Sequence, residues 1–174
     1  MEGLETIVGE RISFRPFRND DAKIYASWLE DDDLCMIVNE KKRNPEEVKE
    51  YQKSLTEDPK FIEYIVIDNK TGKPIGDICL NLENKNSAGL KPTWGLMLGE
   101  SEYRKKGYGS EALALLFDYA KKKLGLEKIY GEVFPSNKEG LKFHTSFGLR
   151  TEKEVTDRDG KECYLFVKDL DRLS

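Results

Sequence analysis

The sequence predicts a mixed α/β fold, with a mostly antiparallel central sheet of about seven strands flanked by about four helices. Short runs of alternating apolar and polar side chains recur along the chain, and this period of two is typical of half-buried strands. Turn residues join several of these runs directly, as in antiparallel hairpins. The longest helical pattern, residues 108–123, lies between two such runs and indicates one strand-helix-strand crossover.

The first half of the chain is predicted to begin with a strand and two helices. Residues 11–17 alternate as a strand does, and residues 19–29 open with short polar side chains that cap a helix. Asn44 and Pro45 begin a second helix, residues 44–55, because Asn is a common N-cap and Pro suits the first helical position. Strands follow at 61–67 and 75–83 around a turn at 68–74, and a polar loop precedes a strand at 92–98.

The second half begins with the helix over 108–123, which has Ala112, Leu116 and Ala120 on its apolar stripe. A strand at 126–134 comes next. Residues 137–147 are predicted to form a helix that is capped by Asn137 and closed by Gly148. Two strands within 149–170, joined around Asp159 and Gly160, complete the expected sheet.

Composition limits the class of protein. A length of 174 residues fits a single domain over 1–174. Apolar runs are shorter than the roughly 18 residues of a membrane helix, and the N-terminus lacks the basic-then-apolar pattern of a secretion signal, so we expect a soluble, cytoplasmic protein without membrane partners. Domains that bind nucleic acid are usually basic, so the net charge of -4 argues against nucleic-acid binding.

Cysteine and histidine are too sparse to suggest a disulfide framework or a metal site. The three cysteines, Cys35, Cys79 and Cys163, are far apart and form no CxxC pair, and the chain has one histidine. We expect each thiol to pack as a small apolar group.

The segment RKKGYGSEAL, residues 104–113, places three cationic side chains and two glycines directly before the predicted helix. A helix N-terminus offers unpaired N–H groups, and glycine lets the backbone approach a phosphate closely, so the segment suits an anion. Its R-x-x-G-x-G spacing matches neither the Walker loop nor the dinucleotide fingerprint. The alternative is a basic turn before an ordinary helix.

Two motifs together resemble the GNAT superfamily of N-acetyltransferases. Arg104, Gly107 and Gly109 match the family's acetyl-CoA loop, R/Q-x-x-G-x-G/A. Val133, Asn137, Gly140 and Gly148 match the strand and helix that follow it in the family, and the likeness extends to residues 12–22 and 74–80. In detail the chain resembles the branch of the ribosomal-protein alanine acetyltransferases of RimJ/RimL type and the polyamine acetyltransferases.

The resemblance implies the GNAT acyl-CoA N-acyltransferase fold, with acetyl-CoA as co-substrate and no metal. It assigns the diphosphate of coenzyme A to the backbone of the loop, and the pantetheine arm to the preceding strand. The implied cofactor-binding residues are Met97, Leu98, Gly99, Arg104, Lys105, Lys106, Gly107, Tyr108, Gly109, Ser110 and Asn137.

The family transfers the acetyl group by direct attack of a primary amine on the thioester. Its usual proton donor is a tyrosine seven residues after the asparagine, where this chain has His144. Histidine could donate the proton, or it could simply pack between its apolar neighbours. Glu132 and Glu100 are candidate bases, although exposed structural carboxylates are the commoner case. Tyr103 and Tyr108 are spare phenols for which packing is the simpler role.

The family's acceptor wall corresponds to the region that contains Glu30, Asp31, Asp32 and Asp33. This run would attract a cationic small-molecule or peptide amine, or it is a solvated acidic loop. Two rival functions are a non-catalytic acetyl-CoA or CoA sensor, suggested by the missing tyrosine, and a plain nucleotide- or phosphate-binding protein. Both a monomer and a homodimer fit the sequence.

Overall fold

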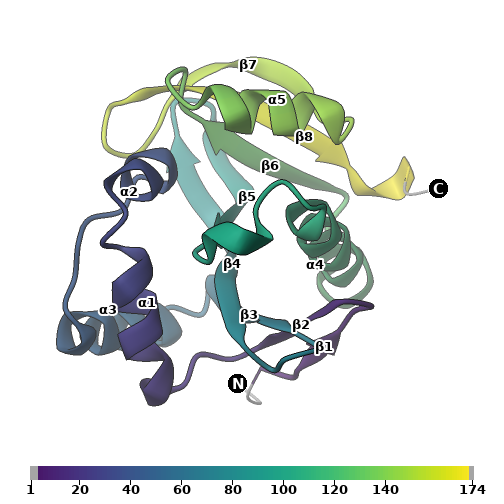
Figure 1. The fold of residues 1–174 in the computed structure, drawn as a ribbon. Coiled ribbons are helices and arrows are strands. Elements are labelled where there is room, and N and C mark those ends of the chain that lie inside the picture. The colour runs from purple at the N-terminus through teal and green to yellow at the C-terminus, as the bar shows by residue number, and fades with distance from the viewer. Residues whose placement is uncertain (1–3, 173–174) are drawn as a thin grey trace. The chain divides into compact units, whose positions relative to one another are not determined.

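Figure 1 shows the fold in a computed structural model, which describes residues 4–172. Within that range there are eight strands and five α-helices, and the predicted mixed α/β class is confirmed. The helices are α1 (Ala22–Trp28), α2 (Asp32–Val38), α3 (Pro45–Glu57), α4 (Tyr108–Leu124) and α5 (Lys138–Ser146). The strands are β1 (Ile7–Val8), β2 (Ile12–Arg15), β3 (Phe61–Asp68), β4 (Pro74–Asn86), β5 (Gly89–Leu98), β6 (Lys128–Val133), β7 (Arg150–Thr156) and β8 (Glu162–Asp169).

Hydrogen bonds join the strands in the order β1-β2-β3-β4-β5-β6-β8-β7. β5 and β6 pair in parallel, with Trp94 opposite Gly131, and α4 connects them along the chain. This confirms the predicted crossover. The pairs β1–β2, β2–β3, β6–β8 and β7–β8 are antiparallel, as expected for short connections.

The chain divides into two compact units, each with its own interior. The first unit comprises Met1–Cys79 and Leu96–Leu115, and the second comprises Leu80–Gly95 and Leu116–Ser174. In the first unit α1 lies beside α3, which packs on β3, and Tyr25, Trp28 and Leu29 belong to the buried cluster. In the second unit, Tyr130 and Leu165 belong to a buried cluster of side chains from β6, β7 and β8. β4, β5 and α4 contribute residues to both units.

The predicted helix ends are confirmed by their hydrogen bonds. Asn44 Oδ1 accepts from the backbone N–H of Glu47 at 3.0 Å, and Glu47 Oε2 accepts from the N–H of Asn44 at 2.8 Å, which is a complete capping box for α3. Asn137 Oδ1 accepts from the N–H of Gly140 at 2.8 Å and caps α5. Gly148 has a φ of 79°, which suits glycine after a helix end.

Two elements were not expected from the sequence, β1 and α2. The residues assigned to an acidic loop instead begin α2, because Asp31 Oδ1 accepts from the N–H of Leu34 at 3.0 Å. Asp32 and Asp33 then lie in the first turn, where negative charge stabilises the end of a helix. Leu34 and Cys35 bury their side chains in the first unit, which compensates for the short length of this helix.

β4 and β5 extend into the polar loop predicted between them. The polar residues at this turn satisfy their own backbone: Asn86 Oδ1 accepts from the N–H of Ala88 at 2.8 Å. Ser87 also exchanges hydrogen bonds with Thr156, its N–H donating at 2.9 Å and its Oγ accepting at 2.8 Å. Gly89 follows with a φ of 99°, so the connection is a tight turn.

Two carboxyl groups meet inside the first unit, Glu63 on β3 and Asp77 on β4. Glu63 Oε2 and Asp77 Oδ1 are buried, and neither has a donor partner among residues 4–172. Burial raises the pKa of Glu63 to about 7. Burial raises the pKa of Asp77 well above its ordinary value, and the adjacent Glu63 raises it further. Two buried carboxyls side by side repel when both are charged, so the raised pKa values favour a protonated form of the pair.

The raised pKa values of Glu63 and Asp77 predict that the free energy of unfolding falls as pH rises. Each folded pKa lies above its unfolded value, so between about pH 4.5 and 7 the native state retains protons that the unfolded chain releases. We expect Asp77→Asn to flatten this dependence, with a Tm close to wild type at pH 5 and several degrees higher at pH 8. Calorimetry of both proteins between pH 5 and pH 8 measures these Tm values. The exposed Asp20→Asn is the control, and an unchanged pH slope in Asp77→Asn would contradict the raised pKa of Asp77.

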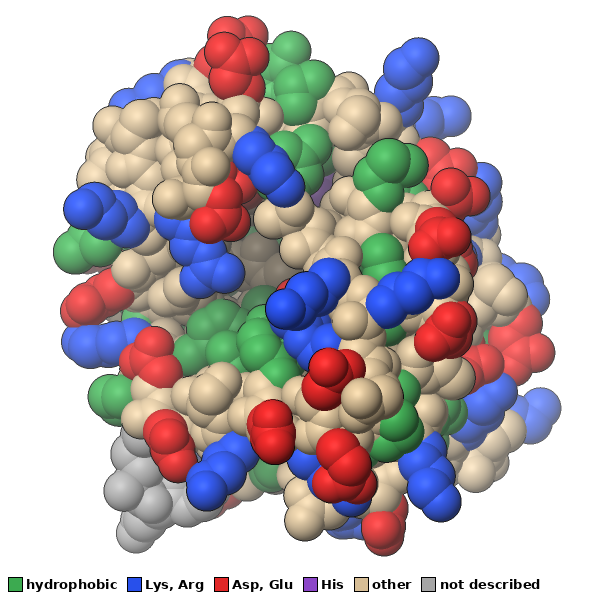
Figure 2. Space-filling model, turned by 90° about the vertical axis from the view of Figure 1, so that its left-hand side faces the viewer, with side chains coloured by type: hydrophobic (Ala, Val, Ile, Leu, Met, Phe, Trp, Pro, Cys, Tyr) green, Lys and Arg blue, Asp and Glu red, His purple; other side chains and the backbone are tan. Residues whose placement is uncertain are grey.

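No helix within residues 4–172 combines the length and apolar character needed to cross a membrane. All three cysteines are free thiols, and Cys35 and Cys163 are buried, as expected for small apolar side chains. On the face drawn in Figure 2, lysine and arginine side chains are intermixed with aspartate and glutamate.

Candidate active site

The predicted anion loop is a turn with two left-handed residues immediately before α4. Lys105 has a φ of 60° and Gly107 a φ of 84°. The carbonyl of Gly107 accepts from the N–H of Glu111 at 3.1 Å, so Gly107 is the last residue before the helical hydrogen bonds begin. Turns of this kind direct successive N–H groups to one side, and here the 17-residue α4 adds the positive end of its dipole. The loop therefore has the backbone geometry of an anion site.

The side chain of Arg104 is directed at the end of β5. Its Nε donates to the carbonyl of Leu98 at 2.8 Å, and its Nη2 donates to that of Gly99 at 3.0 Å. Its Nη1 lies 3.3 Å from Asp31 Oδ2. These contacts join the loop to the strand that precedes it, so the guanidinium of Arg104 has a structural role.

Arg11 also holds the loop, and the sequence analysis did not identify it. Its Nη1 donates to the carbonyl of Lys106 at 3.2 Å, and its Nε donates to Glu111 Oε2 at 2.7 Å. Its guanidinium carbon lies 4.3 Å from the centre of the Tyr108 ring, within the range of a cation–π contact. Arg11 and Glu111 are 100 positions apart, so no local pattern could have linked them.

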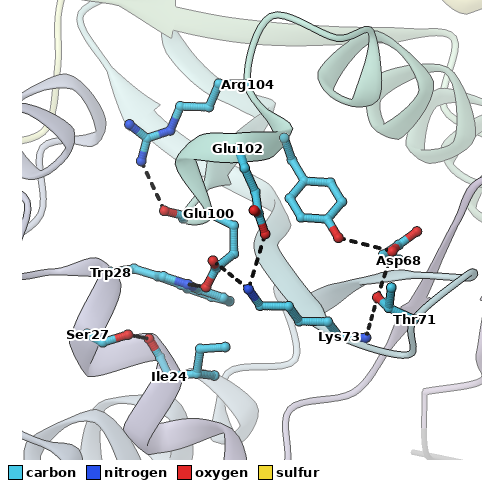
Figure 3. Close-up of polar contacts among 11 residues, drawn as sticks. Ile24, Ser27, Trp28, Asp68, Thr71, Lys73, Glu100, Glu102 and Arg104 are labelled. Atoms are coloured by element: carbon cyan, nitrogen blue, oxygen red, sulfur yellow. Dashed lines mark hydrogen bonds and ion pairs between the residues drawn. The ribbon is translucent and has the colours of Figure 1, made fainter.

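Glu100, a predicted base, is held by two donors in the network of Figure 3. Its Oε1 accepts from Trp28 Nε1 at 2.9 Å, and its Oε2 accepts from Lys73 Nζ at 2.8 Å. Burial acts to raise the pKa of Glu100, but the hydrogen bonds from Lys73 and Trp28 outweigh it and leave that pKa below its ordinary value. A general base works best near the operating pH, so this geometry favours a structural role.

The two spare phenols pack together. Tyr103 and Tyr108 meet edge to face, with ring centres 5.1 Å apart. The hydroxyl of Tyr103 donates to Asp68 Oδ2 at 3.0 Å. The packing role expected for both residues agrees with these contacts.

Gly99 has no room for a side chain. A Cβ built there would lie 2.1 Å from Cδ2 of Trp28, whose indole is buried. This close approach explains the glycine at the end of the strand that the resemblance assigns to the pantetheine arm. The same strand buries Met97.

We therefore expect Gly99→Ala to destabilise the protein by about 3 kcal/mol, because the indole and strand must separate. Gly72→Ala is the control: nothing lies within 4 Å of its added Cβ, and its positive φ alone costs about 1 kcal/mol. Urea unfolding of both variants measures the difference. Equal losses would show that the Trp28 contact relaxes freely.

In the second unit, Glu132 on β6 accepts two side-chain hydrogen bonds. Its Oε1 accepts from Asn84 Nδ2 at 3.0 Å and from Asn86 Nδ2 at 2.8 Å. Both asparagines come from β4. Its half-exposed side chain remains a candidate base, with one oxygen occupied.

His144 on α5 lies among aromatic rings of the second unit. Its imidazole stacks on Trp94, with ring centres 5.3 Å apart, and lies 5.1 Å from the ring of Phe166. Nδ1 is 2.6 Å from the carbonyl oxygen of Gly140. Because a carbonyl only accepts, Nδ1 carries a proton, and Nε2 of the neutral ring is then an acceptor. Burial lowers the pKa of His144, against the opposing effect of the Gly140 hydrogen bond, which favours the neutral ring at pH 7.

Asn137 and two acids of the run at residues 30–33 make local contacts. Asn137 caps α5, and a Cβ added at Gly140 would lie 2.4 Å from Asn137 Nδ2. In the acidic run, Lys42 Nζ lies 3.0 Å from Asp32 and 3.8 Å from Glu30. The run is therefore partly neutralised by neighbouring cations.

Comparison with known proteins identifies the family. A model of the acetyltransferase (GNAT) domain matches residues 11–150. The chain is 26% identical over 152 residues to alpha/beta-tubulin-N-acetyltransferase 9 of Drosophila melanogaster, a match that covers 81% of this chain and 76% of that protein.

Solved structures share the fold. AAC(6')-Ib in a complex with acetyl-CoA superposes with a TM-score of 0.80 at 18% identity, over 94% of this chain and 98% of that one. Ribosomal-protein-S5-alanine acetyltransferase from Vibrio fischeri superposes with a TM-score of 0.73 at 21% identity, over 98% and 99%. Since the domain match spans most of the sequence, the chain belongs to the GNAT acetyltransferase family, and it is an acetyl-CoA-dependent enzyme that acetylates an amine.

Proposed function

We propose that backbone N–H groups of residues 105–110 bind the diphosphate of acetyl-CoA. The observation that carries this assignment is the left-handed turn at Lys105 and Gly107 directly before α4. Its glycine permits close approach, and the helix N-terminus favours negative charge. Met97, Leu98 and Gly99, at the end of β5, are proposed to hold the pantetheine arm by backbone pairing.

We propose that His144 takes a proton during the attack of the amine. The nucleophile must be neutral when it reacts, and an imidazole whose Nε2 is unprotonated can accept the proton that the amine loses. The nitrogen of the substrate amine forms a bond to the carbonyl carbon of the thioester. The carbon–sulfur bond then breaks, and coenzyme A leaves as the thiolate. The imidazolium so formed can then return a proton to the thiolate. This differs from the purely proton-donating role expected from the sequence.

The acceptor is proposed to be the primary amine of a protein N-terminus or of a polyamine, within the ribosomal-protein and polyamine branch of the family. The relatedness to a tubulin N-acetyltransferase supports a protein amine. The acids of α2, Asp32 and Asp33, support a cationic group in either case.

Release of coenzyme A thiol in the presence of each amine tests the proposal, with the product identified by mass shift. The panel holds peptides with different N-terminal residues, polyamines and aminoglycosides. We expect turnover with one class of amine. Tight CoA binding without turnover on any amine would favour the sensor function, and no CoA binding would exclude the proposed loop.

We also propose that the two units work as one acetyltransferase domain over residues 1–174, because β4, β5 and α4 run through both. A cytoplasmic location is proposed from the free thiols. Light scattering of the purified protein distinguishes the monomer from the homodimer.

A further inference from the structure

We propose that Arg11 is a positioning residue that holds the loop of residues 104–110 in the conformation that binds acetyl-CoA. The inference rests on the proposed role of that loop in diphosphate binding. Arg11 lies just before β2 and outside the two motifs that carry the family resemblance.

Four contacts of Arg11 converge on the loop and the first turn of α4. The guanidinium donates from Nη1 to the carbonyl of Lys106 and from Nε to Glu111 Oε2, and it lies over the ring of Tyr108. The backbone N–H of Arg11 donates to Glu111 Oε1 at 2.7 Å, so both oxygens of that carboxylate are used. One side chain thus ties the residue before Gly107 to the helix that follows it.

The contact with Lys106 controls the direction of a proposed diphosphate donor. The carbonyl of Lys106 and the N–H of Gly107 belong to one planar peptide unit, in which they point in opposite directions. When Arg11 binds the carbonyl, the N–H is fixed on the other side of the turn. Glycine at a positive φ has many alternative conformations, so the turn gains order from an external restraint.

The expected effect is on ligand affinity rather than on the fold. The Arg11 side chain is 43% exposed, and an ion pair this accessible contributes little to stability. Arg15 provides a control in β2: its Nη1 and Nη2 each lie 2.7 Å from an oxygen of Asp21, a residue outside the loop. Both arginines bind a carboxylate, but only Arg11 binds the carbonyl of Lys106.

The experiment compares two acetyl donors, acetyl-CoA and S-acetylpantetheine, which lacks the diphosphate. We expect Arg11→Ala to raise the KM for acetyl-CoA about tenfold with a smaller change in kcat, and Arg11→Lys to recover part of the loss. With S-acetylpantetheine the ratio of wild-type to variant activity should fall to about one. Arg15→Lys should leave the KM for acetyl-CoA near wild type.

Two results would overturn the role of Arg11. One is an unchanged KM for acetyl-CoA in Arg11→Ala, and the other is an equal loss with both donors, which would indicate a general structural defect. If Arg11→Ala does not fold, the same comparison of acetyl-CoA with S-acetylpantetheine is made with Arg11→Lys and Glu111→Gln. Failure of the loop assignment is distinguishable, because Gly107→Asp would then also bind CoA normally.

Discussion

Gly107→Asp is expected to weaken acetyl-CoA binding by more than about 100-fold. The substitution puts a carboxylate on the turn proposed to hold a diphosphate, so like charges meet. A Cβ at this position would lie 3.2 Å from Arg11 Nη2, and the new carboxylate would also attract the guanidinium that restrains the loop. Isothermal titration with coenzyme A measures the loss.

Gly107→Asn is the matched control for this experiment. Asparagine has nearly the same shape as aspartate and tolerates a positive φ, but it carries no charge. We expect its affinity to fall by no more than about tenfold. Wild-type affinity in Gly107→Asp would show that the diphosphate binds elsewhere.

His144→Phe should lower kcat about 100-fold and leave the KM for acetyl-CoA near wild type. Phenylalanine can keep the ring contacts with Trp94 and Phe166, so the variant removes the titrating nitrogens and retains the packing. In wild type, activity should be lost as pH falls through the His144 pKa, which lies below its ordinary value of 6.5, because the base is then protonated. The variant should lack this acidic limb.

His144→Gln separates the chemistry from the hydrogen bond. Glutamine offers an N–H group that can donate to the carbonyl of Gly140, but it does not titrate. Its pH profile should therefore resemble that of His144→Phe. A wild-type rate and profile in either variant would assign a structural role to the histidine.

The features predicted correctly from the sequence depend on neighbours along the chain. Asn44 caps α3 through a residue three positions away, and Gly107 permits a turn that is complete within a few residues. The order of strands and helices followed from side-chain periodicity in the same way, since burial of one face imposes that period. α2 and β1 were the exceptions: the seven residues of α2 are too few to show a helical period beside a run of acids, and β1 has only two residues.

Contacts between distant residues could not be predicted from the sequence. Lys73 binds Glu100 because one residue directly precedes β4 and the other closely follows β5, its neighbour in the sheet. Glu63 meets Asp77 because β3 and β4 are also neighbours. An alternating strand pattern assigns side chains to two faces but does not say which neighbour each one meets. Glu100 is an example. The sequence predicted it as a base, but its hydrogen bonds to Trp28 and Lys73, which favour a structural role, could not be predicted.

The division of the first unit also bears on the order of events during synthesis. The unit consists of the N-terminal part of the chain up to Cys79 and of Leu96–Leu115, whereas Leu80–Gly95 belongs to the second unit. The N-terminal strands therefore leave the ribosome well before Glu111, the partner of Arg11, has been made. Until then the nascent chain has exposed strand edges and an incomplete interior. Folding of the first unit is completed by contacts of long sequence separation, which form slowly. The loop that receives the donor substrate is thus among the last parts of its unit to be completed.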